Sequence, residues 1–118
     1  MIATPVPDST GSIPELVFDA YIDIPSFISD SMSYPLEVWT TRRGFVAIVT
    51  DVPDNTSLMN ANEKIAAAVW DRWPGARIIE NWPGKTADGL QFFDTSGTGG
   101  HARVDTDSLS EAGLKLPV

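Results

Sequence analysis

Two short apolar runs enclose one helical segment in the middle of the chain, and this succession restricts the fold more than any other feature. The runs are residues 45–49 (F-V-A-I-V) and 76–82 (A-R-I-I-E-N-W). Between them, apolar side chains recur at every third or fourth position from residue 58 to residue 73, which predicts one amphipathic helix. Pro74 and Gly75 would end it. The pattern predicts strand, helix and strand, so the helix should pack against a sheet.

The segment before this unit predicts two further strands. Residues 15–24 alternate between apolar and polar side chains, which indicates a half-buried strand. Ser12-Ile13-Pro14-Glu15 also resembles a helix start, so a helix is the alternative there. Residues 36–41 and 45–52 are separated only by Arg42-Arg43-Gly44, and they predict an antiparallel hairpin.

The C-terminal part predicts shorter elements. Residues 90–93 and 103–105 indicate short strands, and residues 108–114 indicate a short helix capped by Ser108. We therefore predict an α+β fold: a mixed or antiparallel sheet of about five strands with one main helix packed on one face. The expected order is β-β-β-α-β-β, followed by a short C-terminal helix.

The length of 118 residues predicts a single domain. Residues 1–13 are rich in proline and small polar side chains, so we expect a flexible tail there and a folded domain over 14–118. No basic segment followed by an apolar run opens the chain, and no apolar run approaches the ~20 residues of a membrane span. We expect a cytoplasmic protein without a signal peptide. The lack of cysteine excludes disulfides and thiolate metal sites.

Negative charge is concentrated in the first third of the chain. Residues 1–41 contain six acidic and no basic side chains, within a net charge of −8. Phosphate repulsion disfavours direct contact with nucleic acid, whereas a protein partner with a basic surface would be attracted. The candidate partner-binding residues are Asp19, Asp23, Asp30 and Glu37, which could mimic phosphate charge, and Trp82 as an exposed aromatic contact. The alternative is an acidic surface that only maintains solubility.

A second candidate site lies where the predicted helix begins. Its candidate ligand-binding residues are Arg42, Arg43, Asn55, Ser57, Asn60 and Glu63. Free N–H groups at a helix start and paired guanidinium groups both suit an anion, so a small phosphorylated or nucleotide ligand is the alternative partner. Capping and exposed turn charge explain the same residues without a ligand.

Catalytic signals are weak. His101 is the only histidine, and no nucleophile or carboxylate stands at a recognisable spacing from it. Residues 97–100 are glycine-rich, but no Gly-Lys-Ser/Thr follows, so they are not a nucleotide-binding P-loop. We predict a non-enzymatic protein without cofactor or metal. A hydrolase or nuclease using His101, and an accessory domain that oligomerises through its tryptophans, are the alternatives.

Two segments carry a family resemblance. Residues 49–63 read V-T-D-V-P-D-N-T-S-L-M-N-A-N-E, and residues 79–83 read I-E-N-W-P. They resemble small proteins of actinobacterial plasmids and phages that carry a D-N-x-x-S-x-x-N-A-x-E segment and an I-E-x-[YW]-P strand end. The matching residues are Asp54, Asn55, Ser57, Asn60, Glu63, Glu80 and Pro83, with one residue fewer between Asn55 and Ser57 than in that segment. The resemblance implies a mobile-element origin and an inhibitor of a host defence or regulatory system.

Overall fold

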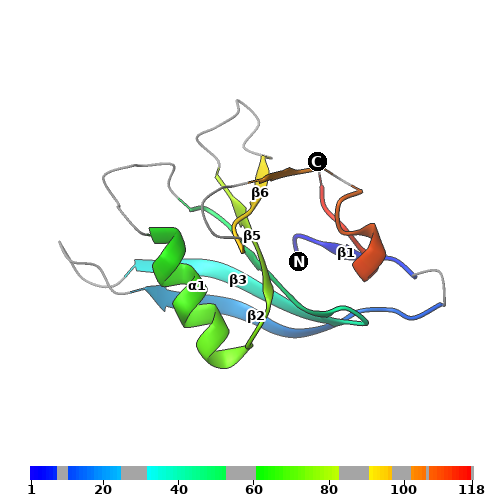
Figure 1. Cartoon of the computed structure of the whole chain (residues 1–118), viewed down its shortest axis with the longest axis horizontal. Coiled ribbons are helices and arrows are strands. Elements are labelled where there is room, and N and C mark those ends of the chain that lie inside the picture. Colours follow the sequence, from blue (N-terminus) through cyan, green and yellow to red (C-terminus); the bar gives the residue numbers. More distant parts are fainter. Residues whose placement is uncertain are drawn as a thin grey trace.

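The computed structural model describes residues 1–7, 11–24, 32–52, 61–82, 91–96, 102–105 and 107–117. A six-stranded sheet with the order β2-β3-β4-β5-β6-β7 forms its centre (Figure 1). The strands are β2 (Glu15–Ile24), β3 (Met32–Thr41), β4 (Gly44–Val49), β5 (Arg77–Asn81), β6 (Phe92–Asp94) and β7 (Ala102–Val104). Helix α1 (Ala61–Arg72) packs on one face, so the predicted α+β class is confirmed.

All neighbouring strands in this sheet are antiparallel except β4 and β5, which are parallel. Parallel neighbours need a crossover connection, and α1 lies in the segment that supplies it. The N–H of Trp73 donates to the carbonyl of Val69 at 2.8 Å, and Gly75 then takes a φ of +75°. The helix therefore ends where Pro74 and Gly75 predict.

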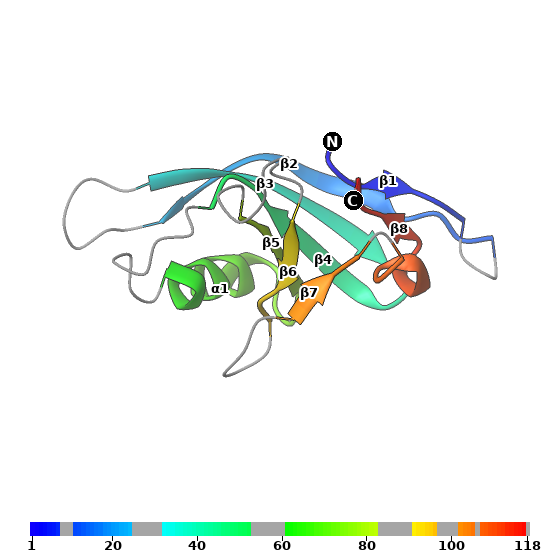
Figure 2. The same ribbon diagram turned by 90° about the horizontal axis from the view of Figure 1, so that it is seen from above.

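A smaller sheet covers part of the opposite face. Strand β1 (Thr4–Pro5) pairs with β8 (Leu114–Lys115), next to the 3₁₀ turn η2 (Ser110–Ala112). Figure 2 shows α1 on one side of the large sheet and the β1–β8 pair on the other, toward opposite ends of β2 and β3. Of the described elements, only α1 therefore covers this end of the β2–β3 ribbon, and it does so on one face.

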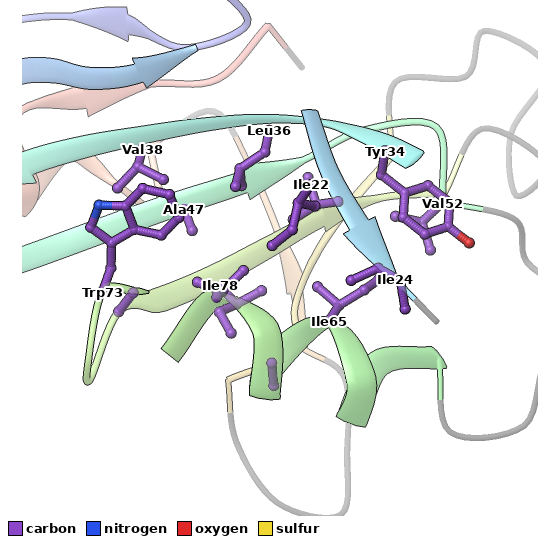
Figure 3. Close-up of a cluster of buried hydrophobic side chains, with 14 of the residues drawn as sticks. Ile22, Ile24, Tyr34, Leu36, Val38, Ala47, Val52, Ile65, Trp73 and Ile78 are labelled. Atoms are coloured by element: carbon purple, nitrogen blue, oxygen red, sulfur yellow. The ribbon is translucent and has the colours of Figure 1, made fainter. Parts of the chain in front are cut away.

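Each face of the sheet has its own apolar core. Between the sheet and α1, strand residues such as Ile22, Leu36 and Ile78 meet Ile65 of the helix (Figure 3). The other core is built around Trp39 and includes the following buried residues: Ala3, Ile48, Ile79, Phe92, Leu109, Leu114 and Leu116. Strands β3, β4 and β5 contribute to both cores, and burial on both faces explains the nearly continuous apolar sequence of β4.

A bulge in β2 lets this one strand serve both cores. Leu16 pairs with Trp39 and packs against the core that is built around Trp39. Phe18 pairs with Val38 and packs against the other core, between the sheet and α1. Two residues apart in a regular strand would share a face. The extra residue, Val17, reverses the alternation and leaves its own side chain 44% exposed. The strand prediction for residues 15–24 is correct, and the helix alternative is wrong.

Two expectations for the chain ends need correction. The proposed flexible tail includes Ala3, which is only 2% exposed, and Val6, whose N–H donates to the carbonyl of Gly113 at 2.7 Å. The proposed terminal helix is a single 3₁₀ turn, and Ser108 bonds back to Asp105 instead of capping it. Both differences arise because the two ends of the chain pair with each other, a contact that no local pattern records.

Candidate functional site

Three exposed residues of β2 share the face of the sheet that points away from α1. Ile22 and Ile24 pack toward the helix, so the alternating Asp19, Tyr21 and Asp23 lie on the opposite face. Tyr21 is 66% exposed, and both aspartates are exposed. Strand periodicity therefore brings two carboxylates and one aromatic ring onto a single uncovered surface.

Strand β3 completes this surface. Tyr21 pairs with Pro35 and Asp23 pairs with Ser33, whose hydroxyl donates a hydrogen bond to the Asp23 carboxylate. We call the surface formed by Asp19, Tyr21, Asp23, Ser33 and Pro35 the acidic face. Neither β2 nor β3 contains a lysine or arginine. The described part of these strands therefore presents negative charge without a base to neutralise it.

Glu37 does not belong to the acidic face, although it was predicted to bind a partner. It pairs with Asp19 but is only 4% exposed. Its carboxylate accepts the backbone N–H groups of Ile2 at 2.6 Å and Ala3 at 2.8 Å, and the indole N–H of Trp39 at 3.0 Å. Three donors satisfy the buried charge, so Glu37 holds the N-terminal segment in place and is inaccessible to a partner.

Trp82 is also buried, contrary to its predicted role as an exposed contact. It is 9% exposed and stacks on Phe93 with ring centroids 4.2 Å apart. Its indole N–H donates to Glu80 at 3.1 Å, and the Thr95 hydroxyl donates to the other oxygen of Glu80 at 2.8 Å. The strand end that follows Glu80 is thus anchored in the α1-side core.

The buried carboxylate of Glu80 affects a neighbouring titratable group. Burial raises the pKa of Tyr34, and the negative charge of Glu80 raises it further. Glu80 itself is fully buried. The resemblance singled out Glu80, and the structure places it at the carboxyl end of β5, inside the core.

The structure does not bring Arg42 and Arg43 to the start of α1, as the proposed ligand site would require. Arg42 and Arg43 form the β3–β4 turn, whereas α1 begins beyond the other end of β4. Six strand residues separate these ends by about 20 Å. The C-terminal end of α1, which leads into β5, therefore lies at the arginine end of the sheet. Glu63, in the first turn of α1, is exposed and remote from both arginines.

The two arginines have local surroundings instead. Arg43 lies 3.7 Å from Glu111 in an exposed ion pair. Arg42 lines a shallow groove of about 290 Å³ together with Ser12, Glu15 and Thr40. Because the Glu15 carboxylate shares this groove, an anionic ligand would meet repulsion as well as attraction there.

Several predicted site residues lie outside the described part of the chain. These are Asp30, Asn55, Ser57, Asn60 and His101. Among the described residues, no group of three or more histidine, aspartate and glutamate side chains could hold a metal ion. No helix in the described ranges is long and apolar enough to cross a membrane.

Comparison with known proteins adds no relative. The chain matches no model of a protein family, and neither the curated proteins nor the solved structures include a significant match. The resemblance drawn from residues 49–63 and 79–83 therefore stays a prediction. On the described surface, the acidic face is the clearest feature that suggests a function.

The acidic face could be anticipated only in part from the sequence. Alternation in residues 15–24 predicted that Asp19, Tyr21 and Asp23 would point away from the apolar side chains. No local pattern indicates that Tyr21 remains uncovered, because that depends on where the chain ends pack. In the alternating pattern, Tyr21 lies on the same side of the strand as Asp19 and Asp23. This shared side is the feature that could have identified Tyr21 as an exposed residue.

Proposed function

We propose that this chain is a non-enzymatic binding protein that covers a basic protein surface with its acidic face. The observation that carries the proposal is the grouping of exposed Asp19 and Asp23 around Tyr21, which is 66% exposed. Charge complementarity steers a basic partner toward such a face and disfavours nucleic acid. If the covered surface is one with which the partner binds nucleic acid, the chain acts as an inhibitor by mimicking phosphate charge.

Tyr21 supplies the apolar contact that charge alone does not provide. Tyrosine offers a large contact area at low cost in side-chain entropy and is enriched at binding hot spots. Val17, 44% exposed at the bulge, extends apolar surface along the same strand. A partner with lysine or arginine around an apolar pocket would match this arrangement.

The two cores support the proposal by making the face rigid. Strand β3 lies between β2 and β4, and its buried side chains contribute to both cores. Glu37, directly across from Asp19, is held by three hydrogen bonds. A face whose strand backbone is held in place before binding loses little backbone entropy when the partner arrives.

A capture experiment with matched charge variants tests this function. Immobilised wild-type protein is compared with the Asp19→Asn/Asp23→Asn variant and with a Glu63→Gln/Asp71→Asn variant, whose substitutions remove two exposed acids of α1. The samples are incubated with a lysate of the host cell that the mobile-element resemblance implies. Proteins retained from it at ~0.05 M salt should be released by ~0.5 M salt, because salt screens interactions between surface charges. We expect the Asp19/Asp23 variant to bind them about tenfold more weakly than wild type.

The α1 variant distinguishes a specific face from overall charge. It has the same net charge as the Asp19/Asp23 variant and should retain the partner as wild type does. Equal losses in the two variants would show that only net charge matters. Retention that does not change with salt would also refute the proposal.

A further inference from the structure

Among the described strands, β2 lies at one edge of the six-stranded sheet. It pairs with β3 on one side, and no described strand pairs with its other side. Ten residues make it a long edge, in contrast to the three residues of β7 at the far side of the sheet. A long free edge offers backbone groups to an added strand.

The register shows which backbone groups face outward. Thr41 and Gly44 close the two-residue β3–β4 turn, and the N–H of Thr50 donates to the carbonyl of Pro35 at 3.1 Å. The odd-numbered residues of β3 therefore bond to β4, and its even-numbered residues bond to β2. In β2, the partners of these even-numbered residues include Phe18, Ala20 and Ile22.

It follows that Asp19, Tyr21 and Asp23 direct both their N–H and C=O groups away from β3. The same three residues carry the side chains of the acidic face. The outward backbone groups and the side chains of the acidic face therefore belong to the same short segment of β2. In an antiparallel pairing, three outward residues can form about six hydrogen bonds.

We infer that the basic partner contributes an extended segment, which adds to the free edge of β2 as a seventh strand of the sheet. This inference rests on the proposed function and specifies how the same face is engaged. Main-chain hydrogen bonds supply affinity, and the alternating side chains supply specificity. A lysine or arginine at every second position of the segment would lie beside Asp19, Tyr21 and Asp23.

The negative charges on β2 favour a basic segment over a second copy of the chain as the strand added to this edge. If two β2 strands paired antiparallel around Tyr21, Asp19 of each copy would stand opposite Asp23 of the other. Like charges directly opposite one another destabilise strand pairing. The carboxylates that protect the edge from self-association therefore favour a basic strand.

Hydrogen exchange on the wild-type protein tests the inference without mutation. The probe is an acetylated, amidated peptide of four Lys-Val repeats, in which lysines recur at every second position. We expect exchange of the amides of Asp19, Tyr21 and Asp23 to slow at least about tenfold in its presence. The amides of Ala20 and Ile22 already face β3 and serve as internal controls that should change little.

A blocked peptide and a pair of variants separate backbone pairing from charge. The same peptide N-methylated on its lysine backbone nitrogens keeps its charge but cannot pair, and it should bind at least about tenfold more weakly. Tyr21→Pro removes one outward N–H at an edge position where proline is tolerated, whereas Tyr21→Ala keeps it. We expect the proline variant to bind more weakly than the alanine variant.

The outcomes separate this inference from the proposed function. If both peptides bind equally and the three amides stay unprotected, strand addition is overturned while the acidic face still stands as a binding surface. No binding of the unmodified peptide also overturns strand addition, and the capture experiment then decides the function on its own. Protection that appears without peptide and disappears on dilution would assign the edge to a second copy and overturn the inference.

Discussion

The carboxylate of Glu37 accepts the backbone N–H of Ala3 at 2.8 Å, although 34 residues separate them in the chain. This buried contact, together with those to Ile2 and Trp39, fixes the N-terminal segment over the Trp39 core. An acidic residue that resembles its exposed neighbours in sequence is therefore a structural element of the fold.

Replacing Glu37 should destabilise the protein strongly. In Glu37→Gln, an NH2 group replaces one carboxylate oxygen and faces an N–H donor that the oxygen had accepted, so we expect a loss of at least about 2 kcal/mol in the free energy of unfolding. Urea denaturation measures it. Asp19→Asn, which changes the exposed carboxylate directly across the ladder, should cost less than about 0.5 kcal/mol. Similar losses in the two variants would contradict the assigned role of Glu37.

Gly113 should be intolerant of any side chain. It adopts a φ of +80°, and an added Cβ would lie 2.9 Å from the carbonyl oxygen of Val6. Gly11 has the same φ of +80° but open space around its Cβ position, so it is a matched control. Gly11→Ala should cost about 1 kcal/mol from backbone strain alone. Thermal unfolding should show a larger cost for Gly113→Ala, and an equal cost would mean that the close approach to Val6 does not matter.

Alkaline pH should weaken the fold through Tyr34. Burial, and then the charge of Glu80, raise its pKa above the ordinary value of 10.0. The unfolded chain therefore releases the phenol proton first, and stability should fall as the pH rises above about 10. Tyr34→Phe has no phenol proton to release, so the slope of its unfolding free energy against pH above 10 should be shallower than in wild type. An unchanged slope would rule out Tyr34 as its source.

Acid should weaken the fold through Asp94. Burial acts to raise its pKa, but hydrogen bonds from Ser96 and Arg77 outweigh burial, and the pKa lies below the ordinary value of 3.8. Its stabilising contribution is present above about pH 4 and is lost as the pH falls through the lowered pKa. Asp94→Asn should therefore lose stability at pH 7 and show a weaker decline toward acid pH.

The partners of Asp94 provide the control for this prediction. The Nε–H of Arg77 donates to Asp94 at 2.7 Å, and the N–H of Ser96 donates to it at 3.0 Å. Ser96→Ala keeps the ion pair and removes only the hydroxyl, so it should reduce the acid dependence less than Asp94→Asn does. The measurement is the free energy of unfolding of wild type and the two variants at pH 3 and pH 7. Identical pH dependence in all three proteins would refute the role of Asp94 in acid stability.

Local pattern was sufficient for most of the secondary structure. The period of two in residues 15–24, the hairpin around Arg42 and Arg43, and the helix ended by Pro74-Gly75 all appear in the structure. These features depend on interactions between residues close in sequence, or on the burial of one side of a single element. The α+β class followed from their order, because a half-apolar helix and half-apolar strands must cover one another.

Local sequence patterns were therefore enough to locate the strands of the large sheet and the main helix, but not the β1–β8 pair. Which acidic residues are exposed was settled by the fold, because burial depends on what packs above a residue. Asp19 and Glu37 are neighbours in the same ladder, but the N-terminal segment covers one and leaves the other in solvent. The structure likewise separated Arg42 from the helix start, buried Trp82 and left β2 at the edge. Each of these depends on contacts between residues distant in sequence, which periodicity and composition do not contain.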